Sequence, residues 1–280
     1  MKRNSDLNFS ERLRSVQATT NSLLCVGLDT DARLLPPHLG SSADAVLEFN
    51  RQIVEATHDL VSAYKLNLAF YEALGDRGWP MLRNTLELIP RTLLKIGDGK
   101  RGDVGNTAEH YARSMFDDLG FDAATVNPYM GRDSVEPFLR NVQKGVFLLA
   151  LTSNPGSRDF QRLKVAGKPL YENVVSSAKK WNTGKNIGLV VGATHPKELR
   201  RIRQLVPEMP LLIPGIGAQK GNLMSAVRFG CDRKGISALI NVSRGVIYAS
   251  SSRDFAASAR KEALRIRDEI RMYQTEFFSS

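Results

Sequence analysis

The sequence predicts an α/β fold, namely a (β/α)8 TIM barrel formed by one domain over residues 1–280. Short apolar runs rich in β-branched residues recur along the chain, with amphipathic helical stretches between them. The runs are apolar almost throughout rather than alternating, as in strands covered on both faces. Eight strand-then-helix units close a barrel, and an open doubly wound sheet is the alternative. The expected strands are residues 23–28, 63–69, 92–97, 123–127, 146–152, 187–193, 211–216 and 238–243.

The segments between the strands carry the expected helices. Residues 42–60 have apolar positions three and four apart, and Ser42 is a suitable N-cap for that helix. Residues 106–120 and 195–206 follow the same pattern. We expect a helix within residues 1–22 that closes the barrel floor, and a terminal helix at residues 253–280. The longest connection, residues 154–186, has room for a lid as well as a helix.

Composition excludes several classes of protein. The chain is 42% hydrophobic and 24% charged, which excludes global disorder. No run approaches the roughly 18 apolar residues of a membrane-spanning helix, and the N-terminus lacks the apolar core of a secretory signal. Two cysteines, Cys25 and Cys231, are too few for a disulfide scaffold, so a cytoplasmic protein is expected. The four histidines lie far apart in the sequence, so no zinc site is expected.

The net charge of +10 suits nucleic acid, an acidic membrane or a phosphorylated small molecule as partner. Basic residues concentrate at 158–185 and 197–203, but they spread over several helix faces. Because the sequence has no contiguous basic stripe with interleaved aromatic residues, a basic nucleic-acid-binding protein is only the non-enzymatic alternative. We expect neither nucleic acid nor a membrane as partner.

Polar or glycine-rich segments follow most of the expected strands, and in such a barrel the chemistry lies at the carboxyl ends of the strands. Lys65 and Asn67 of the second strand are two residues apart and therefore share a face. A lysine inside an apolar strand is informative, because a buried cation needs a partner. The other candidates at strand ends are Asp29, Asp98, Lys100, Asp103, Ser153, Gly217, Gln219, Arg244 and Gly245.

Four of these residues form a set of alternating charge: Lys65, Asp98, Lys100 and Asp103. Asp98 and Lys100 are two apart on a segment expected to be extended, so both side chains can face the pocket. Lys65 on the neighbouring strand can reach Asp98. In a partly dry pocket, a pair about 4 Å apart gains on the order of 4 kcal/mol at an effective dielectric of about 20. The alternative is an ion-pair network that only closes the barrel mouth.

A candidate phosphate cradle follows the last two strands. Residues 215–221, GIGAQKG, supply flexible backbone that can aim N–H groups at an anion. Arg244 can bind two phosphate oxygens at once. A phosphate site at these two loops recurs in this fold. The alternative is that the glycines only serve tight turns.

Taken together, these residues resemble the orotidine 5′-phosphate decarboxylase family over nearly the whole chain, from Asp29 to Ala249. The central motif is DGKRGDVGNT, residues 98–107, which matches the signature Asp-x-Lys-x-x-Asp with a following threonine. The phrases KLNLAFYE at 65–72, VNPYMG at 126–131 and TSNPG at 152–156 are similar to the bacterial branch with the longer chain. Their order on the correct strand ends makes the resemblance specific.

The resemblance implies a reaction: decarboxylation of orotidine 5′-phosphate to uridine 5′-phosphate, the last step of pyrimidine nucleotide synthesis, with no metal or cofactor. It implies that Lys100 stabilises the carbanion at C6 of the pyrimidine and then protonates it. Asp98 would lie beside the substrate carboxylate, and Lys65 would position Asp98.

The resemblance also implies binding roles and a homodimer. Asp103 and Thr107 would complete the site of the partner subunit. The remaining roles are ribose hydroxyls for Asp29 and Lys65, the pyrimidine for Ser153, and the phosphate for Gln219 and Arg244 with backbone around Gly217 and Gly245. Asn67 joins the substrate-binding set through the face that it shares with Lys65.

The closest alternative on the same scaffold is a magnesium-dependent sugar-phosphate decarboxylase or aldolase, which shares the Asp-x-Lys-x-x-Asp pattern. A metal requirement would favour it, whereas the phrases NPYMG, TSNPG and GIGAQ argue against it. A catalytically dead phosphosugar-binding barrel is a further alternative. The intact set Lys65, Asp98, Lys100 and Asp103 argues against such decay.

Overall fold

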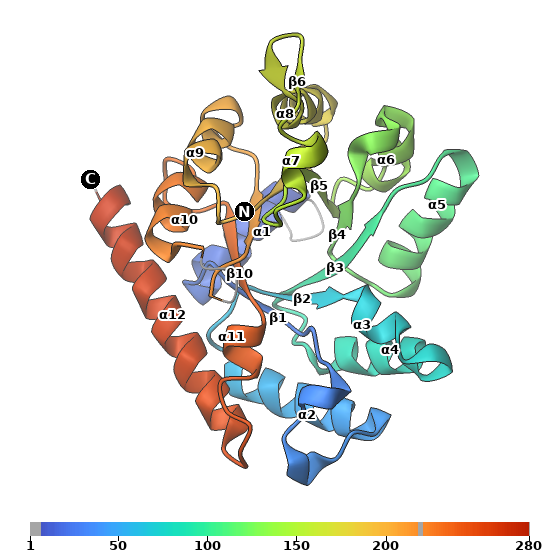
Figure 1. Cartoon of the computed structure of the whole chain (residues 1–280), viewed down its shortest axis with the longest axis vertical. Helices are drawn as coiled ribbons and strands as arrows, with labels where there is room; N and C mark the ends of the chain where they lie inside the picture. The colour runs from blue at the N-terminus through green and yellow to red at the C-terminus, as the bar shows by residue number, and fades with distance from the viewer. Residues whose placement is uncertain (1–6, 218–220, 280) are drawn as a thin grey trace.

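A ring of parallel strands forms the centre of the molecule, with helices around it (Figure 1). The computed structural model describes residues 7–217 and 221–279. Within these ranges, eight strands close a barrel in the order β1-β10-β9-β8-β5-β4-β3-β2, so the predicted barrel is confirmed and the open sheet is wrong. The barrel strands are β1 Leu24–Gly27, β2 Ala63–Asn67, β3 Leu94–Arg101, β4 Ala123–Val126, β5 Gly145–Leu151, β8 Ile187–Val191, β9 Leu211–Pro214 and β10 Ala238–Val242.

The third strand departs from its predicted bounds. We expected it to end at Gly97, but β3 continues to Arg101, and its register against β4 shifts between Gly97 and Arg101. Lys100 lies in this stretch with φ of 48°, so the expectation of a regular extended segment is wrong at this residue. The left-handed conformation is uncommon for a residue with a side chain.

Helices pack on the outside of the barrel. Ser42 caps α2 as predicted, because its hydroxyl accepts a hydrogen bond from Ala45 N at 3.1 Å. The predicted terminal helix is α12, which packs against α2, α10 and α11 along one side of the barrel (Figure 1). The main helices are α1 Phe9–Thr20, α2 Ala43–Thr57, α3 Leu68–Glu72, α4 Gly78–Leu88, α5 Gly105–Arg113, α6 Arg132–Leu139, α7 Ser157–Phe160, α8 Leu170–Trp181, α9 Pro196–Leu205, α10 Leu223–Gly230, α11 Arg244–Ile247 and α12 Phe255–Phe278.

The helix α1 closes the barrel floor, as expected from residues 1–22. Residues 1–6 lie outside the described part of the chain, and the helix begins at Phe9 behind a capping box of Asn8 and Glu11. Phe9 and Leu13 are fully buried and join the lower layer of the barrel interior. A Cβ on Gly145 would lie 2.5 Å from the Phe9 ring, so the strand β5 needs glycine where this ring enters.

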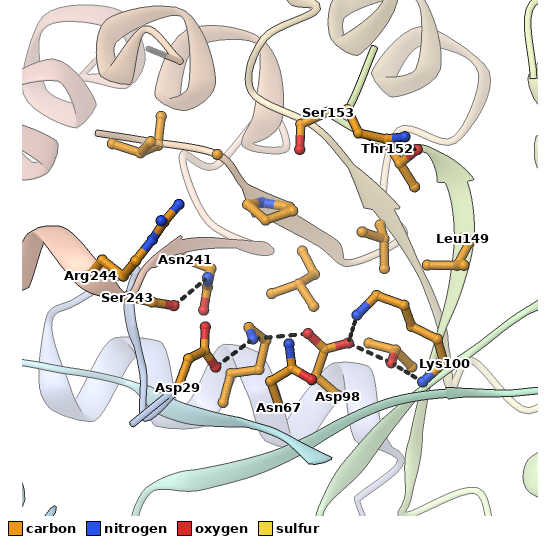
Figure 2. Close-up of a pocket in the computed structure, with 18 of the residues that line it drawn as sticks. Asp29, Asn67, Asp98, Lys100, Leu149, Thr152, Ser153, Asn241, Ser243 and Arg244 are labelled. Atoms are coloured by element: carbon orange, nitrogen blue, oxygen red, sulfur yellow. Dashed lines mark hydrogen bonds and ion pairs between the residues drawn. The ribbon is translucent and has the colours of Figure 1, made fainter. Parts of the chain in front are cut away.

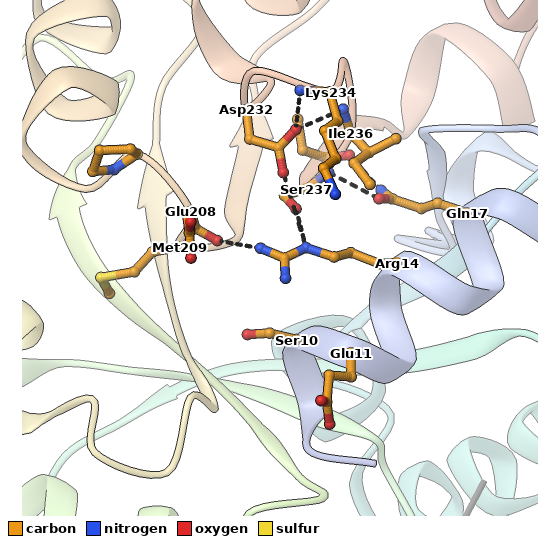
Figure 3. A network of polar contacts seen from close by, with 12 residues as sticks. Ser10, Glu11, Arg14, Gln17, Glu208, Met209, Asp232, Lys234, Ile236 and Ser237 are labelled. Atoms are coloured by element: carbon orange, nitrogen blue, oxygen red, sulfur yellow. Dashed lines mark hydrogen bonds and ion pairs between the residues drawn. The ribbon is translucent and has the colours of Figure 1, made fainter. Parts of the chain in front are cut away.

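Polar contacts tie α1 to the segments that lead into β9 and β10 (Figure 3). Arg14 donates to the hydroxyl of Ser237 at 3.0 Å and to the carbonyl of Glu208 at 3.1 Å. Gln17 donates to the carbonyl of Ala238 at 2.7 Å and accepts from the backbone N–H of Ser237 at 3.0 Å. The helix is therefore held by buried hydrogen bonds as well as by apolar packing.

The longest connection lies between β5 and β8. It contains the short helix α7, a hairpin of β6 (Lys164–Val165) and β7 (Lys168–Pro169), and then α8. The hairpin projects beyond α8 at the periphery of the molecule (Figure 1). Phe160, Leu163 and Val165 of this connection are exposed. The predicted helix is confirmed, and movement of the connection as a lid stays a prediction.

Among the described residues, no helix is both long enough and apolar enough to cross a membrane.

Replacing Phe9 tests the role of α1 as the floor of the barrel. Its ring is fully buried and meets Phe147 edge-to-face at 5.7 Å between centroids. We expect Phe9→Ala to lower the free energy of unfolding by about 3–5 kcal/mol, because a buried aromatic ring leaves a cavity. Urea denaturation measures this, with Met272→Ala on the exposed side of α12 as the control that changes little. A loss for Phe9→Ala no larger than that of the control would contradict the packing role.

Candidate active site

A cavity of about 430 Å³ opens at the carboxyl ends of the strands (Figure 2). Its wall combines charged, polar and apolar side chains from all eight barrel strands or the segments that directly follow them. Eight of the candidates named from the sequence line it together: Asp29, Lys65, Asn67, Asp98, Lys100, Ser153, Arg244 and Gly245.

The carboxylate of Asp98 lies between two ammonium groups. Lys65 Nζ is 2.9 Å from Asp98 Oδ2, and Lys100 Nζ is 2.8 Å from Asp98 Oδ1. Lys65 Nζ also lies 3.5 Å from Asp29 Oδ1. The predicted contact of Lys65 with Asp98 and the predicted common face of Asp98 and Lys100 are therefore confirmed. Asp98 and Lys65 are buried, whereas the side chain of Lys100 is 46% exposed and so can meet a ligand in the cavity.

Burial and charge act in opposite directions on these groups. Burial alone would raise the pKa of the Asp98 carboxyl, but the charges and hydrogen bonds of Lys65 and Lys100 hold that pKa well below its usual range. Burial alone would lower the pKa of Lys65, but Asp29 and Asp98 raise that pKa above its usual value. Both groups therefore stay charged at neutral pH.

Strand geometry explains how the residues of the first two strands meet. Lys65 and Asn67 alternate with buried apolar residues on β2, so both face the cavity. Asp29 follows β1 by two residues. A Cβ on Gly27 would lie 1.9 Å from Ser243 Oγ, so only glycine lets the ends of β1 and β10 approach this closely.

Apolar side chains form one wall of the cavity beside Lys100. Leu149 of β5 lies next to Lys100 in Figure 2, and Val190 of β8 and Leu212 of β9 complete this wall. Val190 and Leu212 are buried. Apolar walls lower the local dielectric, which strengthens the electrostatic effect of each nearby charge.

Arg244 and the loops after β9 and β10 form the opposite side of the cavity (Figure 2). Gly215 and Gly245 line it, and the guanidinium of Arg244 extends from the start of α11. Gly217 has φ of 81°, a conformation that favours glycine, and lies just beyond the lining residues. Gln219 lies outside the described residues, so its predicted role stays a prediction.

Hydrogen bonds hold the segment that carries Ser153. The backbone N–H of Thr152 donates to Gln161 Oε1 at 2.8 Å, and the ring of His195 lies 3.2 Å from the carbonyl of Thr152. The hydroxyl of Thr194 donates to the carbonyl of Ser153 at 3.4 Å. Residues from the long connection and from the β8 loop therefore support this part of the wall.

Asp103 and Thr107 do not join the cavity of their own chain. Asp103 Oδ1 accepts a hydrogen bond from the backbone N–H of Val104 at 2.8 Å, and Thr107 is exposed on α5. Within the described ranges, no cation pairs with Asp103. The four alternating charges expected from spacing thus reduce to three in one chain, because β3 ends at Arg101 and the chain turns into α5.

Sequence reasoning missed several residues of the cavity. The most important is Thr125 of β4, whose hydroxyl donates to Asp98 Oδ1 at 2.8 Å. Asn241 also lines the cavity, as do Thr152 and Ser243, which end two predicted strands but were assigned no role. Thr125 and Asn241 could have been identified as polar side chains inside apolar strand runs. Lys65 was identified in this way, because a buried polar group needs a partner.

Among the described residues, histidine, cysteine, aspartate and glutamate form no group of three or more that could hold a metal ion.

Comparison with known proteins identifies relatives over most of the chain. Residues 22–259 match the model of the "Orotidine 5'-phosphate decarboxylase / HUMPS family". An orotidine 5′-phosphate decarboxylase of Dehalococcoides mccartyi is 50% identical over 275 residues, which cover 97% of this chain and 100% of the relative. Neither the nucleic-acid-binding nor the magnesium-dependent alternative gains support from this relative.

Solved structures agree with the sequence comparison. The Leishmania donovani OMP decarboxylase superposes with a TM-score of 0.83 at 39% identity, covering 96% of this chain and 99% of that one. The Leishmania donovani UMP synthase superposes with a TM-score of 0.85 at 40% identity, and the match spans 96% of this chain but only 57% of that longer chain. By family model, sequence identity and structure, the chain belongs to the orotidine 5′-phosphate decarboxylase / HUMPS family.

Proposed function

We propose that this chain decarboxylates orotidine 5′-phosphate to uridine 5′-phosphate, the last step of pyrimidine nucleotide synthesis. The observation that carries the proposal is the buried Lys65–Asp98–Lys100 contact at the carboxyl ends of the barrel strands. The family membership and the decarboxylase name of the 50% identical relative support the same reaction. We place the enzyme in the cytoplasm, since both of its cysteines are free and its product feeds nucleotide metabolism.

Lys100 is the proposed catalytic residue. Loss of carbon dioxide from C6 leaves an electron pair with no conjugated acceptor in the ring, so the site must stabilise it through charge. The half-exposed ammonium of Lys100 supplies that charge and then the proton that completes the product. Because Asp98 holds the ammonium at 2.8 Å, the group is already oriented before the reaction begins.

Asp98 and Lys65 prepare the reaction centre. Asp98 lies beside the proposed position of the substrate carboxylate, where its charge would disfavour the carboxylate and favour its departure as neutral carbon dioxide. Lys65 forms the ion pair that allows the buried Asp98 to stay charged. With Asp29 and Asn67, Lys65 also presents donors and acceptors to the ribose hydroxyls.

The phosphate binds on the side of Arg244, away from the reaction centre. Arg244 can pair with two phosphate oxygens, and the backbone near Gly217 and Gly245 can add N–H donors. Gln219 is a further proposed phosphate ligand, and Ser153 a ligand of the pyrimidine. Binding energy released at this remote group can hold the reacting carboxylate against Asp98.

We propose a homodimer in which Asp103 and Thr107 reach the partner's site. The carboxylate of Asp103 points to no cation of its own chain among the described residues, which fits a role in another subunit. Val104, Tyr129 and Met130 beside it are 51%, 82% and 51% exposed, and such an apolar patch is typical of an interface. The two segments that carry these residues are neighbours, because Asn127 N donates to the carbonyl of Arg101 at 2.8 Å.

A decarboxylation assay in excess EDTA tests the reaction and the role of Lys100. We expect metal-free turnover by the wild-type protein, and a loss of at least about a thousandfold in kcat for Lys100→Ala, because charge stabilisation and the proton are removed together. Lys179→Ala on the exposed face of α8 is the matched control and should keep full activity. Turnover that needs added magnesium would move the assignment to the sugar-phosphate branch.

The pKa of Asp98 predicts how stability depends on pH. Because the folded pKa lies below that of an unfolded aspartate, about 3.9, the ion pairs stabilise the fold fully above about pH 5 and are lost as the pH falls through the folded pKa. Asp98→Asn should therefore destabilise by about 3 kcal/mol at pH 7. This difference should shrink by about 1.4 kcal/mol for each pH unit below about 3.9.

Urea denaturation of both proteins at pH 7, 5 and 3 measures that dependence. Asp118→Asn is the control, since Asp118 pairs with Arg83 at the surface and should change stability by less than about 0.5 kcal/mol. A difference between wild type and Asp98→Asn that stays constant from pH 7 to pH 3 would contradict a charged, ion-paired Asp98.

Mixing two inactive variants tests the shared site. In a dimer of Lys100→Ala with Asp103→Ala, one site combines an intact Lys100 with an intact Asp103 from the other subunit. Random exchange makes half of the dimers mixed, so about a quarter of the sites should regain activity. Lys100→Ala mixed with Asp98→Ala is the control without recovery, because both residues lie in one pocket. Equal recovery in both mixtures, or none in either, would rule out a shared site.

A further inference from the structure

Thr125 lies at the point where the ladder between β3 and β4 is interrupted. Gly97 pairs with Ala124 and Arg101 pairs with Val126, so three residues of β3 face one residue of β4. The three are Asp98, Gly99 and Lys100, and the single residue opposite them is Thr125. A bulge of this kind redirects the side chains of the strand that carries the extra residues. The bulge therefore sets the directions of the Asp98 and Lys100 side chains, and Thr125 is the residue of β4 that lies opposite it.

The hydroxyl of Thr125 bonds to both residues at once. The backbone N–H of Lys100 donates to Thr125 Oγ1 at 2.9 Å, and Thr125 Oγ1 donates to Asp98 Oδ1 at 2.8 Å. The directions are fixed, because a backbone N–H can only donate and an ionised carboxylate can only accept. A single oxygen with one proton thus satisfies both partners, and Thr125 itself is 1% exposed.

This contact supports an unusual backbone conformation. Lys100 has φ of 48°, in the left-handed region that residues with a side chain rarely adopt. A residue held there persists only where surrounding contacts enforce it. The bond to Thr125 replaces the ladder partner that the N–H of Lys100 lacks at the bulge. The bond to Thr125 fixes the backbone of Lys100, and the bond to Asp98 fixes the position of its ammonium group.

We propose that Thr125 is a positioning residue for the proton-donating lysine: its hydroxyl holds the backbone of Lys100 and the carboxylate of Asp98 in one geometry. The proposal rests on the decarboxylase function above and adds a residue that acts through Lys100. The hydroxyl bonds to Lys100 and Asp98, which lie across the cavity from Arg244 (Figure 2). Its loss should therefore slow the chemical step and leave substrate binding nearly unchanged.

Four variants separate the hydroxyl from its surroundings. Thr125→Val removes the hydroxyl at nearly constant shape, and Thr125→Ser keeps the hydroxyl while removing the methyl group. Thr125→Ala differs from Thr125→Ser only by the hydroxyl, so this pair tests the same contact if Thr125→Val does not fold. Thr57→Val is the matched control, because Thr57 is fully buried and bonds to Ile53 and Tyr64 away from the cavity.

Steady-state kinetics and thermal melting of each purified protein give the readouts. We expect kcat of Thr125→Val to fall by about 100-fold, since a misplacement of about 1 Å costs that much, with KM within about threefold of wild type. Thr125→Ser should recover most of kcat, whereas Thr125→Ala should not. Thr57→Val should lose a similar amount of melting temperature and keep the wild-type kcat.

Each contrary outcome has a distinct meaning. Wild-type kcat in folded Thr125→Val, or equal values in the serine and alanine variants, would overturn the positioning role. A rise in KM with unchanged kcat would also overturn it, by assigning Thr125 to binding. If the wild-type protein itself fails to decarboxylate the substrate, the proposed function falls and the role of Thr125 falls with it. An active wild type with unaffected variants would remove only the role of Thr125.

Discussion

The charge of Asp98, held between two lysines inside the barrel, is the constraint on which the site depends. A carboxylate and an ammonium taken out of water are costly unless they are paired. Lys65 is 4% exposed and Asp98 is 8% exposed, so neither can remain charged without the other. The pair requires β2 and β3 to be neighbours, with Asn67 opposite Asp98 in the register. The pairing of β2 with β3 that helps to close the barrel therefore also allows the site to keep its buried charges.

Lys100 differs from Lys65 in the way that its proposed role as proton donor demands. Lys65 is surrounded by protein and bonds to two carboxylates, which raise its pKa, so it is fixed in charge and place. The ammonium of Lys100 bonds to Asp98 alone among the described residues, and nearly half of the Lys100 side chain is exposed to the cavity. A group that must approach a substrate and give up a proton needs this freedom at its end. Its backbone is correspondingly constrained, by Thr125 and by the bulge.

The sequence predicts the parts of this arrangement that follow from local periodicity. Lys65 and Asn67 share a face because strands alternate, and Asp29, Ser153 and Arg244 reach the cavity because parallel strands end at one rim. The bulge in β3 was not predictable in this way. The left-handed Lys100 depends on a hydroxyl from β4, 25 residues away, and no property of DGKRGD itself indicates it. The chain turn that takes Asp103 away from Lys100 follows from the same irregular strand end.

The distribution of charge across the cavity relates substrate binding to the loss of carbon dioxide. Three cations, Lys65, Lys100 and Arg244, line it with two carboxylates, Asp29 and Asp98, so the cavity is net positive by one charge among its lining residues. An anionic substrate is attracted as a whole. Within the cavity, however, both carboxylates contact Lys65, and Asp98 and Lys100 lie across the cavity from Arg244 (Figure 2). In the proposed binding mode the phosphate meets Arg244, which pairs with no carboxylate among the described residues, whereas the reacting carboxylate meets a cation already paired with Asp98. Attraction of the phosphate to Arg244 can therefore hold the reacting carboxylate beside Asp98, where its charge is least favourable. Departure of that carboxylate as neutral carbon dioxide is most favourable at this position.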